Sequence, residues 1–386
     1  MDKKINIIGK DALRMDYLGS DIKKLGFGLM RLPMKDGKID IDQTKLMVDK
    51  FISKGFTYFD TAYVYGDDGA SEKAMKEAIV DRYPREMLRL TSKLPIWCCK
   101  TSADMQKIFD TSLERTGAEY FDFYLQHSLS RDKLRQLDDL GAWDFVAEQK
   151  KKGLVKHMGF SFHDTADVLD EILTRHPEQE FVQLQINYSD WESDSVQSRK
   201  CYETAVKHGK PVVIMEPVRG GSLAVLTPEI REIFKKINPN MSIASWAIRF
   251  AASLDGVITV LSGMSDLAQV EDNIDYMEEF VPLSDEEIKA VMTAADILKN
   301  TPTIPCTGCK YCVEGCPMNI NIPEIFKSYN QYKVYGNKNR AQTDYGRITE
   351  NGGKASDCIS CGQCESVCPQ HIEIPDLLSD IAKTLE

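Results

Sequence analysis

The stretch Phe56-Thr-Tyr-Phe-Asp-Thr-Ala-Tyr-Val-Tyr-Gly66 begins with residues that favour a buried strand and turns polar at Asp60. Tyr65 follows on a segment that has the pattern of a loop, with a turn at Gly66. A carboxylate and a phenol that follow a buried strand lie at the mouth of a protein core, where an active site can form. Taken alone, the stretch also fits a strand capped by any polar residue, with Tyr65 covering the edge of the core.

Similar apolar runs recur along the chain, and helical patterns separate them. The other candidate strands are Leu25–Met30, Leu88–Leu94, Phe121–Gln126, His157–Phe162, Phe181–Ile186, Pro211–Met215 and Val257–Leu261. The candidate helices run from an N-cap at Asp42 to Gly55, and then near 71–82, 102–116, 136–152, 165–175, 193–209, 228–252 and 265–280. Eight strands alternating with eight helices predict a closed (β/α)8 TIM barrel, an α/β fold.

An open, doubly wound sheet is the alternative to the barrel. That fold would place a glycine-rich phosphate-binding fingerprint after its first strand. Here Gly26-Phe-Gly28 is not continued by the remaining glycine and a helix start. The sequence therefore favours the barrel.

Polar side chains follow most of the predicted strands. Because the active site of a TIM barrel lies at the carboxyl ends of its strands, these residues are the candidate catalytic and binding groups. Each has a structural alternative, such as a solvated rim charge for Lys93 or a hydrogen-bonded rim histidine for His127. Their combination favours catalysis. They are Asp60, Tyr65, Lys93, His127, Ser161, Gln183, Gln185, Asn187 and Glu216.

Length and charge limit the other classes of function. A chain of 386 residues exceeds the size of a single core, so we expect one large domain and a smaller one. A net charge of −11 argues against binding to nucleic acid or to anionic membranes. We find no apolar run long enough for a membrane helix and no export signal in Met1–Gly9, so we expect a cytoplasmic protein.

Eight of the eleven cysteines lie in two blocks of the same spacing near the C-terminus. Each block reads Cys-x2-Cys-x2-Cys-x3-Cys-Pro, which is the spacing that holds thiolates around 4Fe-4S clusters. In two-cluster ferredoxins the fourth cysteine of each block binds the other cluster. Zinc is a weaker alternative, because structural zinc sites do not need this arrangement twice. The expected ligand sets are Cys306, Cys309, Cys312 and Cys368 for one cluster, and Cys358, Cys361, Cys364 and Cys316 for the other.

The break at Asn300-Thr-Pro-Thr-Ile-Pro305 separates the cysteine blocks from the barrel. Ser284-Asp-Glu-Glu287 has the pattern of a capping box that opens a helix before this break. We therefore expect three parts: a barrel over 1–283, a helix and linker over 284–305, and a two-cluster ferredoxin-type domain over 306–386. Within the last part we expect a polar loop at 336–354.

The barrel part resembles the aldo-keto reductase family over roughly residues 22–282. The matching motifs are Gly28-Leu-Met-Arg31, Phe59-Asp-Thr-Ala-x-x-Tyr65-Gly66, Thr91-Ser-Lys93, Tyr124-Leu-Gln-His127, Gly159-Phe-Ser161 and Glu216-Pro-Val-Arg-Gly-Gly221. With the appended cysteine blocks, the chain looks like the branch of this family that carries a C-terminal ferredoxin-type domain.

The resemblance implies a catalytic tetrad of Asp60, Tyr65, Lys93 and His127. Reduction of a carbonyl by hydride builds negative charge on oxygen, so the site needs a proton donor and a hydrogen-bond donor. Tyr65 would give the proton, with Lys93 making the phenol a stronger acid and Asp60 keeping Lys93 charged. His127 would orient the carbonyl.

The resemblance also implies a bound nicotinamide nucleotide, either NADP(H) or NAD(H). Ser161 and Gln183 would hold the nicotinamide carboxamide, and the loop that follows Glu216 would lie along the pyrophosphate. Two positions depart from the family's pattern: Phe162 stands where Asn is common, and Met215 where an aromatic ring usually stacks on nicotinamide. The remaining implied contacts are Gly220, Gly221, Ser222 and Leu223 in the loop, and Gly263, Ser265, Gln269 and Asn273 near the adenosine phosphate.

We therefore expect an oxidoreductase that reduces a small aldehyde or ketone at the barrel mouth. Two 4Fe-4S clusters would transfer electrons, with ferredoxin or another electron carrier as partner. Two alternatives stay open: a redox-sensing or regulatory subunit, and an NAD(P)H-dependent carbonyl reductase whose clusters are purely structural.

Overall fold

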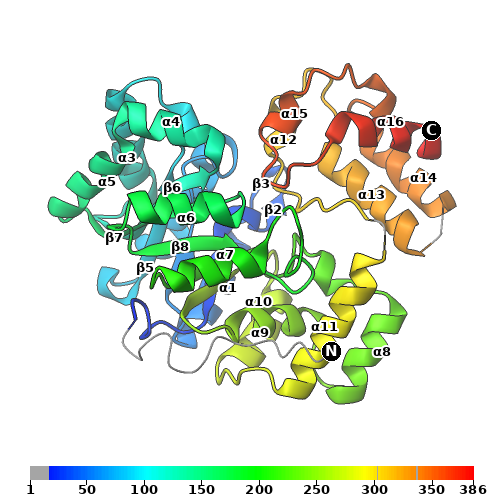
Figure 1. Cartoon of the computed structure of the whole chain (residues 1–386), viewed down its shortest axis with the longest axis horizontal. Helices are drawn as coiled ribbons and strands as arrows, with labels where there is room; N and C mark the ends of the chain where they lie inside the picture. Colours follow the sequence, from blue (N-terminus) through cyan, green and yellow to red (C-terminus); the bar gives the residue numbers. More distant parts are fainter. Residues whose placement is uncertain (1–16, 302, 336–337) are drawn as a thin grey trace. The chain divides into compact units, whose positions relative to one another are not determined.

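A computed structural model describes residues 17–301, 303–335 and 338–386 (Figure 1). The N-terminal stretch searched above for an export signal lies outside this range. Two compact units make up the chain. The first holds the chain up to Pro217 together with Ala244–Ser284, and the second holds Val218–Ile243 and Asp285–Glu386. The three-part division expected from the sequence stays a proposal.

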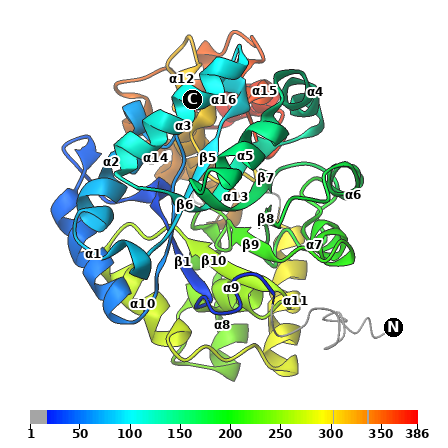
Figure 2. The same cartoon turned by 90° about the vertical axis from the view of Figure 1, so that its left-hand side faces the viewer.

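A closed barrel of eight parallel strands forms the centre of the first unit, as predicted. Its strands lie in the order β1-β10-β9-β8-β7-β6-β5-β4, so chain neighbours are also neighbours in space. Figure 2 shows the strands at the centre, with helices such as α1, α3 and α6 around them. The bounds are β1 (Leu25–Gly28), β4 (Tyr58–Asp60), β5 (Arg89–Leu94), β6 (Phe121–Leu129), β7 (Val155–Phe162), β8 (Phe181–Gln185), β9 (Val212–Met215) and β10 (Val257–Ser262).

Apolar side chains fill the barrel interior. The Phe123 ring lies 5.1 Å from the Tyr58 ring and 5.2 Å from the Phe181 ring, measured between centroids. Val213 and Ile258 complete this buried cluster from β9 and β10. The barrel is therefore a packed core, which leaves the carboxyl ends of the strands as the place for chemistry.

The predicted helices occur, but two of them are split. The pattern at 136–152 forms two helices that meet at Gly141, which adopts a left-handed φ of 70°. The pattern at 228–252 also forms two, because Pro239 cannot continue a helix. The helices of the first unit are α1 (Ile41–Ser53), α2 (Ala70–Met75), α3 (Ser102–Thr116), α4 (Arg131–Leu140), α5 (Ala142–Lys151), α6 (Ala166–Arg175), α7 (Ser198–Lys207), α9 (Ile243–Ala252) and α10 (Leu267–Met277).

In the first unit one local prediction is wrong, and one local element was missed. The N-cap of α1 is Asp40, whose carboxylate accepts a hydrogen bond from the Gln43 amide at 3.0 Å, so the prediction of Asp42 was wrong. The hairpin of β2 (Met34–Lys35) and β3 (Lys38–Ile39) was not predicted. Its turn is Asp36-Gly37, a pair that favours tight hairpins because both residues tolerate positive φ.

The second unit contains helices and, among its described residues, one isolated parallel β-bridge between Ile320 and Gly353. Its elements are α8 (Pro228–Ile237), α11 (Asp285–Lys299), α12 (Tyr311–Glu314), α13 (Ile322–Tyr335), α14 (Lys338–Thr349), α15 (Gln363–Ser366) and α16 (Ile374–Leu385). Helices α13, α14 and α16 lie side by side in Figure 1. Their buried side chains, including Ile325, Phe326 and Leu378, form a core of their own.

The polar loop expected at 336–354 is wrong, because α14 occupies most of it. Tyr345 is buried on this helix, and its hydroxyl accepts a hydrogen bond from the Ala355 amide at 2.7 Å. The same hydroxyl donates to the Glu386 side chain. Ala341 and Tyr345 give only one turn of helical spacing, too little for the sequence to indicate a helix.

No helix in the described ranges is long and apolar enough to span a bilayer.

Candidate active site and cluster sites

Three of the four predicted tetrad residues form one hydrogen-bonded group at the barrel mouth. Asp60 ends β4, and Lys93 lies on the neighbouring strand β5. The Lys93 ammonium donates to the Asp60 carboxylate at 2.6 Å and to the Thr61 carbonyl at 2.8 Å. It also donates to the Tyr65 hydroxyl at 3.4 Å. The parallel pairing of β4 and β5 therefore places the carboxylate, ammonium and phenol together.

The buried Lys93–Asp60 pair controls the charges in this group. Lys93 is only 1% exposed. Burial lowers the pKa of its ammonium, and the Asp60 carboxylate and the more distant Glu72 oppose that shift. Burial raises the pKa of Asp60, while the Lys93 ammonium and the neighbouring Gln183 side chain favour the carboxylate. Each charge is thus stabilised by the other, because water cannot reach either.

His127, the fourth tetrad residue, lies beside Tyr65, with their ring centroids 5.8 Å apart. Its side chain is buried, and burial lowers the pKa of the imidazole well below its ordinary value. The positive charges of Lys93 and Lys133, and then His163, lower it further. The imidazole is therefore neutral at physiological pH, with one N–H to donate.

A bulge in β6 sets the direction of His127. The pairing of β6 with β7 shifts register between Gln126 and Leu129, and Ser128 has a left-handed φ of 56°. The Ser128 amide donates to the Ser161 hydroxyl at 2.7 Å. Bulges turn side chains next to active sites, and strained backbone persists only where its surroundings hold it. Ser161 thus braces the strand that carries His127.

Gln183 has one polar atom left over. Its Oε1 atom is buried with no hydrogen-bond partner among the described residues. A buried orphan acceptor is costly, so it marks a place where a ligand donor fits. The Ser161 hydroxyl can still donate its own hydrogen. These two groups suit the N–H and C=O of a carboxamide.

Gln185 and Asn187, the other polar residues of the β8 region, are used within the protein. Both side-chain amides donate to the Asp190 carboxylate, at 2.9 and 2.8 Å. Asn187 also donates to the Glu216 carbonyl at 3.1 Å. Their role is to hold the loop after β8.

Arg31 joins several predicted nucleotide contacts, and the sequence interpretation missed it as a site residue. Its guanidinium pairs with the Glu216 carboxylate at 2.7 Å. Its carbonyl accepts from the Ser265 hydroxyl at 2.8 Å, and Gly263 leaves room beside its side chain. The motif Gly28-Leu-Met-Arg31 was the available signal, but nothing local to it showed which distant residues it meets.

Two other predicted nucleotide contacts lie on α10 and bond within the protein. The Gln269 side chain accepts from the Ser265 amide at 2.9 Å and donates to the Asp266 carboxylate. The buried Asn273 donates to Ser262 at 2.7 Å and accepts from Tyr276 at 2.5 Å. Gln269 remains exposed, whereas the side-chain nitrogen and oxygen of Asn273 both have hydrogen-bond partners within the protein.

The loop Gly220-Gly221-Ser222-Leu223 belongs to the second unit, where it meets the first cysteine block. A Cβ atom on Gly220 would lie 2.2 Å from the carbonyl oxygen of Thr307, a buried residue between Cys306 and Cys309. A Cβ on Gly221 would meet nothing within 4 Å. The loop therefore needs glycine at 220 for close packing on the cysteine block.

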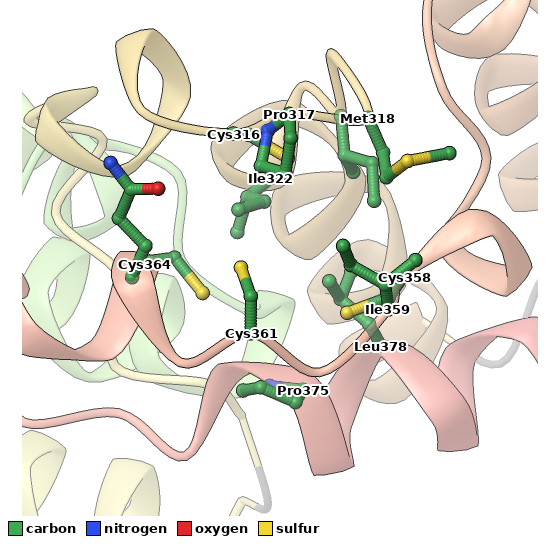
Figure 3. A pocket seen from close by; sticks show the side chains of 12 residues that line it. Cys316, Pro317, Met318, Ile322, Cys358, Ile359, Cys361, Cys364, Pro375 and Leu378 are labelled. Atoms are coloured by element: carbon green, nitrogen blue, oxygen red, sulfur yellow. The ribbon is translucent and has the colours of Figure 1, made fainter.

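One pocket collects four cysteines from both blocks. Figure 3 shows Cys361 and Cys364 on one side of it and Cys316 across from them. The pocket has about 330 Å³ of empty space, including the part open to solvent. Its other lining is largely apolar, as at Ile322 and Leu378. The four thiol-bearing residues are those predicted for one cluster: Cys316, Cys358, Cys361 and Cys364.

The other four cysteines also lie near one another. Burial raises the pKa of the Cys312 thiol above its ordinary value. Three neighbouring thiols raise it further through repulsion of the charged form: Cys309, Cys306 and Cys368. The Gly308 amide donates to the Cys306 sulfur at 3.4 Å, a bond that stabilises a thiolate.

The sequence repeat is also a structural repeat. Each block has positive φ at matching positions, Gly308 and Lys310 in the first and Ser360 and Gly362 in the second. Each is followed by one turn of helix, α12 or α15, and after its Cys-Pro by a longer helix, α13 or α16. Such alternating backbone turns its amides toward anions, which suits thiolate-bound iron.

The donor set and lining therefore fit two 4Fe-4S clusters. Among the described residues, no three His, Cys, Asp or Glu side chains converge on a position for a single metal ion. The residues that would hold the clusters are the eight cysteines of the two sets. The clusters would supply one-electron transfer when bound.

A closed (β/α)8 barrel with polar strand ends, joined to a unit with two cysteine blocks, defines a barrel protein with an iron–sulfur unit. Comparison with known families agrees. The Aldo/keto reductase family matches residues 24–296, and a 4Fe-4S dicluster domain matches residues 305–373. The chain therefore belongs to the aldo/keto reductase family, whose members are oxidoreductases, and carries a 4Fe-4S dicluster domain. This confirms the resemblance stated from the sequence.

Curated relatives match part of the chain. It is 31% identical over 195 residues to "Probable aldo-keto reductase 1" of Glycine max, covering 47% of this chain and 52% of that protein. It is 29% identical over 185 residues to "D-galacturonate reductase" of Fragaria ananassa, covering 42% and 54%. The chain thus spans about half the length of these relatives.

Solved structures share the fold. Aldo-keto reductase AKR11C1 from Bacillus halodurans matches with a TM-score of 0.56 at 23% identity, over 72% of this chain and 95% of that one. An aldo-keto reductase from Klebsiella pneumoniae, solved in complex with NADPH, matches with a TM-score of 0.58 at 21% identity, over 74% and 94%.

The crossed cysteine sets can be tested by substitution. We expect Cys316→Ala to alter the same cluster as Cys358→Ala, because both thiols face one pocket, and to leave the cluster altered by Cys306→Ala intact. The measurement is the EPR spectrum of each variant after anaerobic reduction with dithionite. If the Cys316→Ala spectrum instead matches that of Cys306→Ala, each block binds its own cluster and the crossed arrangement is wrong.

The contact of Gly220 with Thr307 gives a second prediction. Gly220→Ala should displace the Thr307 carbonyl and change the EPR signal of the cluster held by Cys306, because the added Cβ has no room. Gly221→Ala is the matched control. Its backbone is also left-handed, with a φ of 90°, so it carries similar strain of about 1–2 kcal/mol without the clash. Equal EPR spectra for the two variants would contradict the prediction.

Proposed function

We propose that the chain reduces an aldehyde or ketone at the barrel mouth with hydride from NADH or NADPH, and that its two 4Fe-4S clusters exchange electrons with a partner such as ferredoxin. The observation that carries the reduction is the hydrogen bond from the buried Lys93 ammonium to the Tyr65 hydroxyl. It pairs a proton donor with a positive charge at the barrel mouth.

The tetrad residues have distinct roles in this proposal. Tyr65 gives its proton to the carbonyl oxygen, and the Lys93 ammonium stabilises the phenolate that remains. Asp60 keeps Lys93 charged and fixed in place. His127, held neutral by its surroundings, donates its N–H to the same oxygen as negative charge develops there.

The nucleotide would be held by the residues implied by the family resemblance. A bound nicotinamide supplies the hydride. Ser161 and Gln183 would bind its carboxamide, and the orphan Oε1 of Gln183 supports this. Glu216 would act by holding the Arg31 guanidinium, which could pair with a phosphate. The remaining proposed contacts are Gly220, Gly221, Ser222, Leu223, Gly263, Ser265, Gln269 and Asn273.

The pocket of the second cysteine set supports electron exchange with a partner. Ile359 and Met318 line this pocket and are also 60% and 36% exposed. Cys361 itself is exposed. A cluster bound there would lie close to an apolar stretch of surface, where a carrier can approach. If the clusters were purely structural, we would expect both sets of cysteines to lie deep within the unit.

Replacement of Tyr65 tests the reduction. We expect Tyr65→Phe to lower kcat/KM for a simple aldehyde by about 10²–10⁴-fold, because general acid catalysis is lost, while NADH and NADPH affinity is retained. Turnover and nucleotide binding are measured separately on the protein with its clusters. The matched control is Tyr63→Phe in the same loop, whose ring packs under Arg115. Full turnover by Tyr65→Phe would contradict the assignment of the proton donor.

The electron-transfer role is tested without substrate. Under anaerobic conditions, addition of NADH or NADPH should bleach the visible absorbance of the clusters and produce a reduced-cluster EPR signal, if nicotinamide and clusters share one electron path. An unchanged spectrum despite measurable nucleotide binding would count against this path. Reduction by ferredoxin alone would then limit the clusters to exchange with the partner.

A further inference from the structure

Lys133 carries a positive charge beside the proposed carbonyl site. It lies in the first turn of α4, and its ammonium donates to the Ser128 carbonyl at 2.6 Å and to the Ser128 hydroxyl at 3.4 Å. Ser128 directly follows His127 in the bulge of β6. The Lys133 ammonium therefore bonds to the residue next to His127, whose imidazole is proposed to orient the carbonyl.

An aromatic side chain connects Lys133 to the tetrad. The ammonium lies 5.0 Å from the centroid of the Trp97 ring, and that ring lies 5.1 Å from the His127 ring. His127 in turn lies against Tyr65. Successive contacts thus connect four side chains at the barrel mouth: Lys133, Trp97, His127 and Tyr65. Trp97 is 40% exposed, so a ligand can contact its ring.

No carboxylate neutralises this charge. Among the described residues, Lys133 forms no ion pair within 4.0 Å. Burial lowers the pKa of its ammonium, and the charge of Asp132 opposes that shift without a contact. The Asp132 carboxylate instead accepts from the Ser130 hydroxyl. A half-buried ammonium that bonds only to a carbonyl and a hydroxyl is poorly compensated, which favours an anion from outside.

The other titratable groups on this side do not supply that anion. Lys93, His127 and His163 are all cationic or neutral, and the charges of Lys93 and His163 lower the pKa of His127. Lys133 could instead have a structural role, in which its hydrogen bonds to Ser128 hold the bulge of β6 in place. That role needs a hydrogen-bond donor but not a positive charge, so the two roles can be separated by substitution.

We propose that the carbonyl substrate carries an anionic group, a carboxylate or a phosphate, which pairs with Lys133 across the Trp97 ring while the carbonyl meets Tyr65 and His127. This inference rests on the proposed reduction and names its substrate class. The Trp97 ring would cover the carbon chain that joins the two groups.

Matched substrates test the charge. Lys133→Gln keeps a donor for the Ser128 carbonyl but removes the charge. We expect it to lower kcat/KM about tenfold or more for succinic semialdehyde relative to butanal, or for glyceraldehyde 3-phosphate relative to glyceraldehyde. The pair that responds identifies the anion as carboxylate or phosphate. Lys133→Arg should restore the preference.

The control for net charge is Lys151→Gln. Lys151 is exposed at the end of α5 and pairs with Glu148, so its loss should leave all four rates unchanged. Equal loss of charged and neutral substrates in Lys133→Gln would mean that Lys133 only braces the bulge, and the inference would be wrong. Unchanged rates for both pairs would overturn it as well.

Equilibrium binding separates this inference from the proposed reduction. Succinate, inorganic phosphate and the neutral analogue succinamide are titrated calorimetrically into the protein with its clusters. If no carbonyl is reduced by any variant, the proposed function fails. Tighter binding of either anion than of succinamide, lost in Lys133→Gln, still supports the anion site. Absence of anion binding to the unaltered protein, or equal binding to Lys133→Gln, overturns it.

Discussion

The buried ion pair of Lys93 and Asp60 is the constraint on which the barrel mouth depends. Two charges removed from water are costly unless each is fully bonded, and here the ammonium uses its three donors on a carboxylate, a carbonyl and a phenol. The pair requires β4 and β5 to keep their register. It therefore fixes the geometry of the candidate active site.

The second organising feature is the bulge in β6. A left-handed serine is unfavourable, but Ser161 holds its amide and Lys133 holds its carbonyl. At this bulge His127 lies beside Tyr65, and the Lys133 ammonium bonds to the next residue. One irregular residue thus connects the proposed proton donor, the carbonyl-orienting group and the proposed anion contact.

The iron–sulfur unit depends on pairing of its two halves. Cys316 from the first block faces the pocket of the second, and Cys368 lies near the thiols of the first. Each group of four cysteines therefore draws on both blocks of the sequence. The segment between them, α13 and α14, is part of the shared core that keeps the halves together, so it has a structural role beyond that of a spacer.

The sequence by itself determined the eight strands, the closed barrel, the family and the cysteine blocks, because these depend on local periodicity, fixed spacing and short motifs. It also named the tetrad residues by their strand ends. Only the tertiary structure decided the α4–α5 split, the helix α14, the bulge at Ser128, the place of Arg31 and the approach of Gly220 to Thr307. Each of these depends on partners distant in sequence, or on a single backbone angle. The packing of distant residues selects among local conformations that are nearly equal in free energy, and it leaves no periodic signal in the chain.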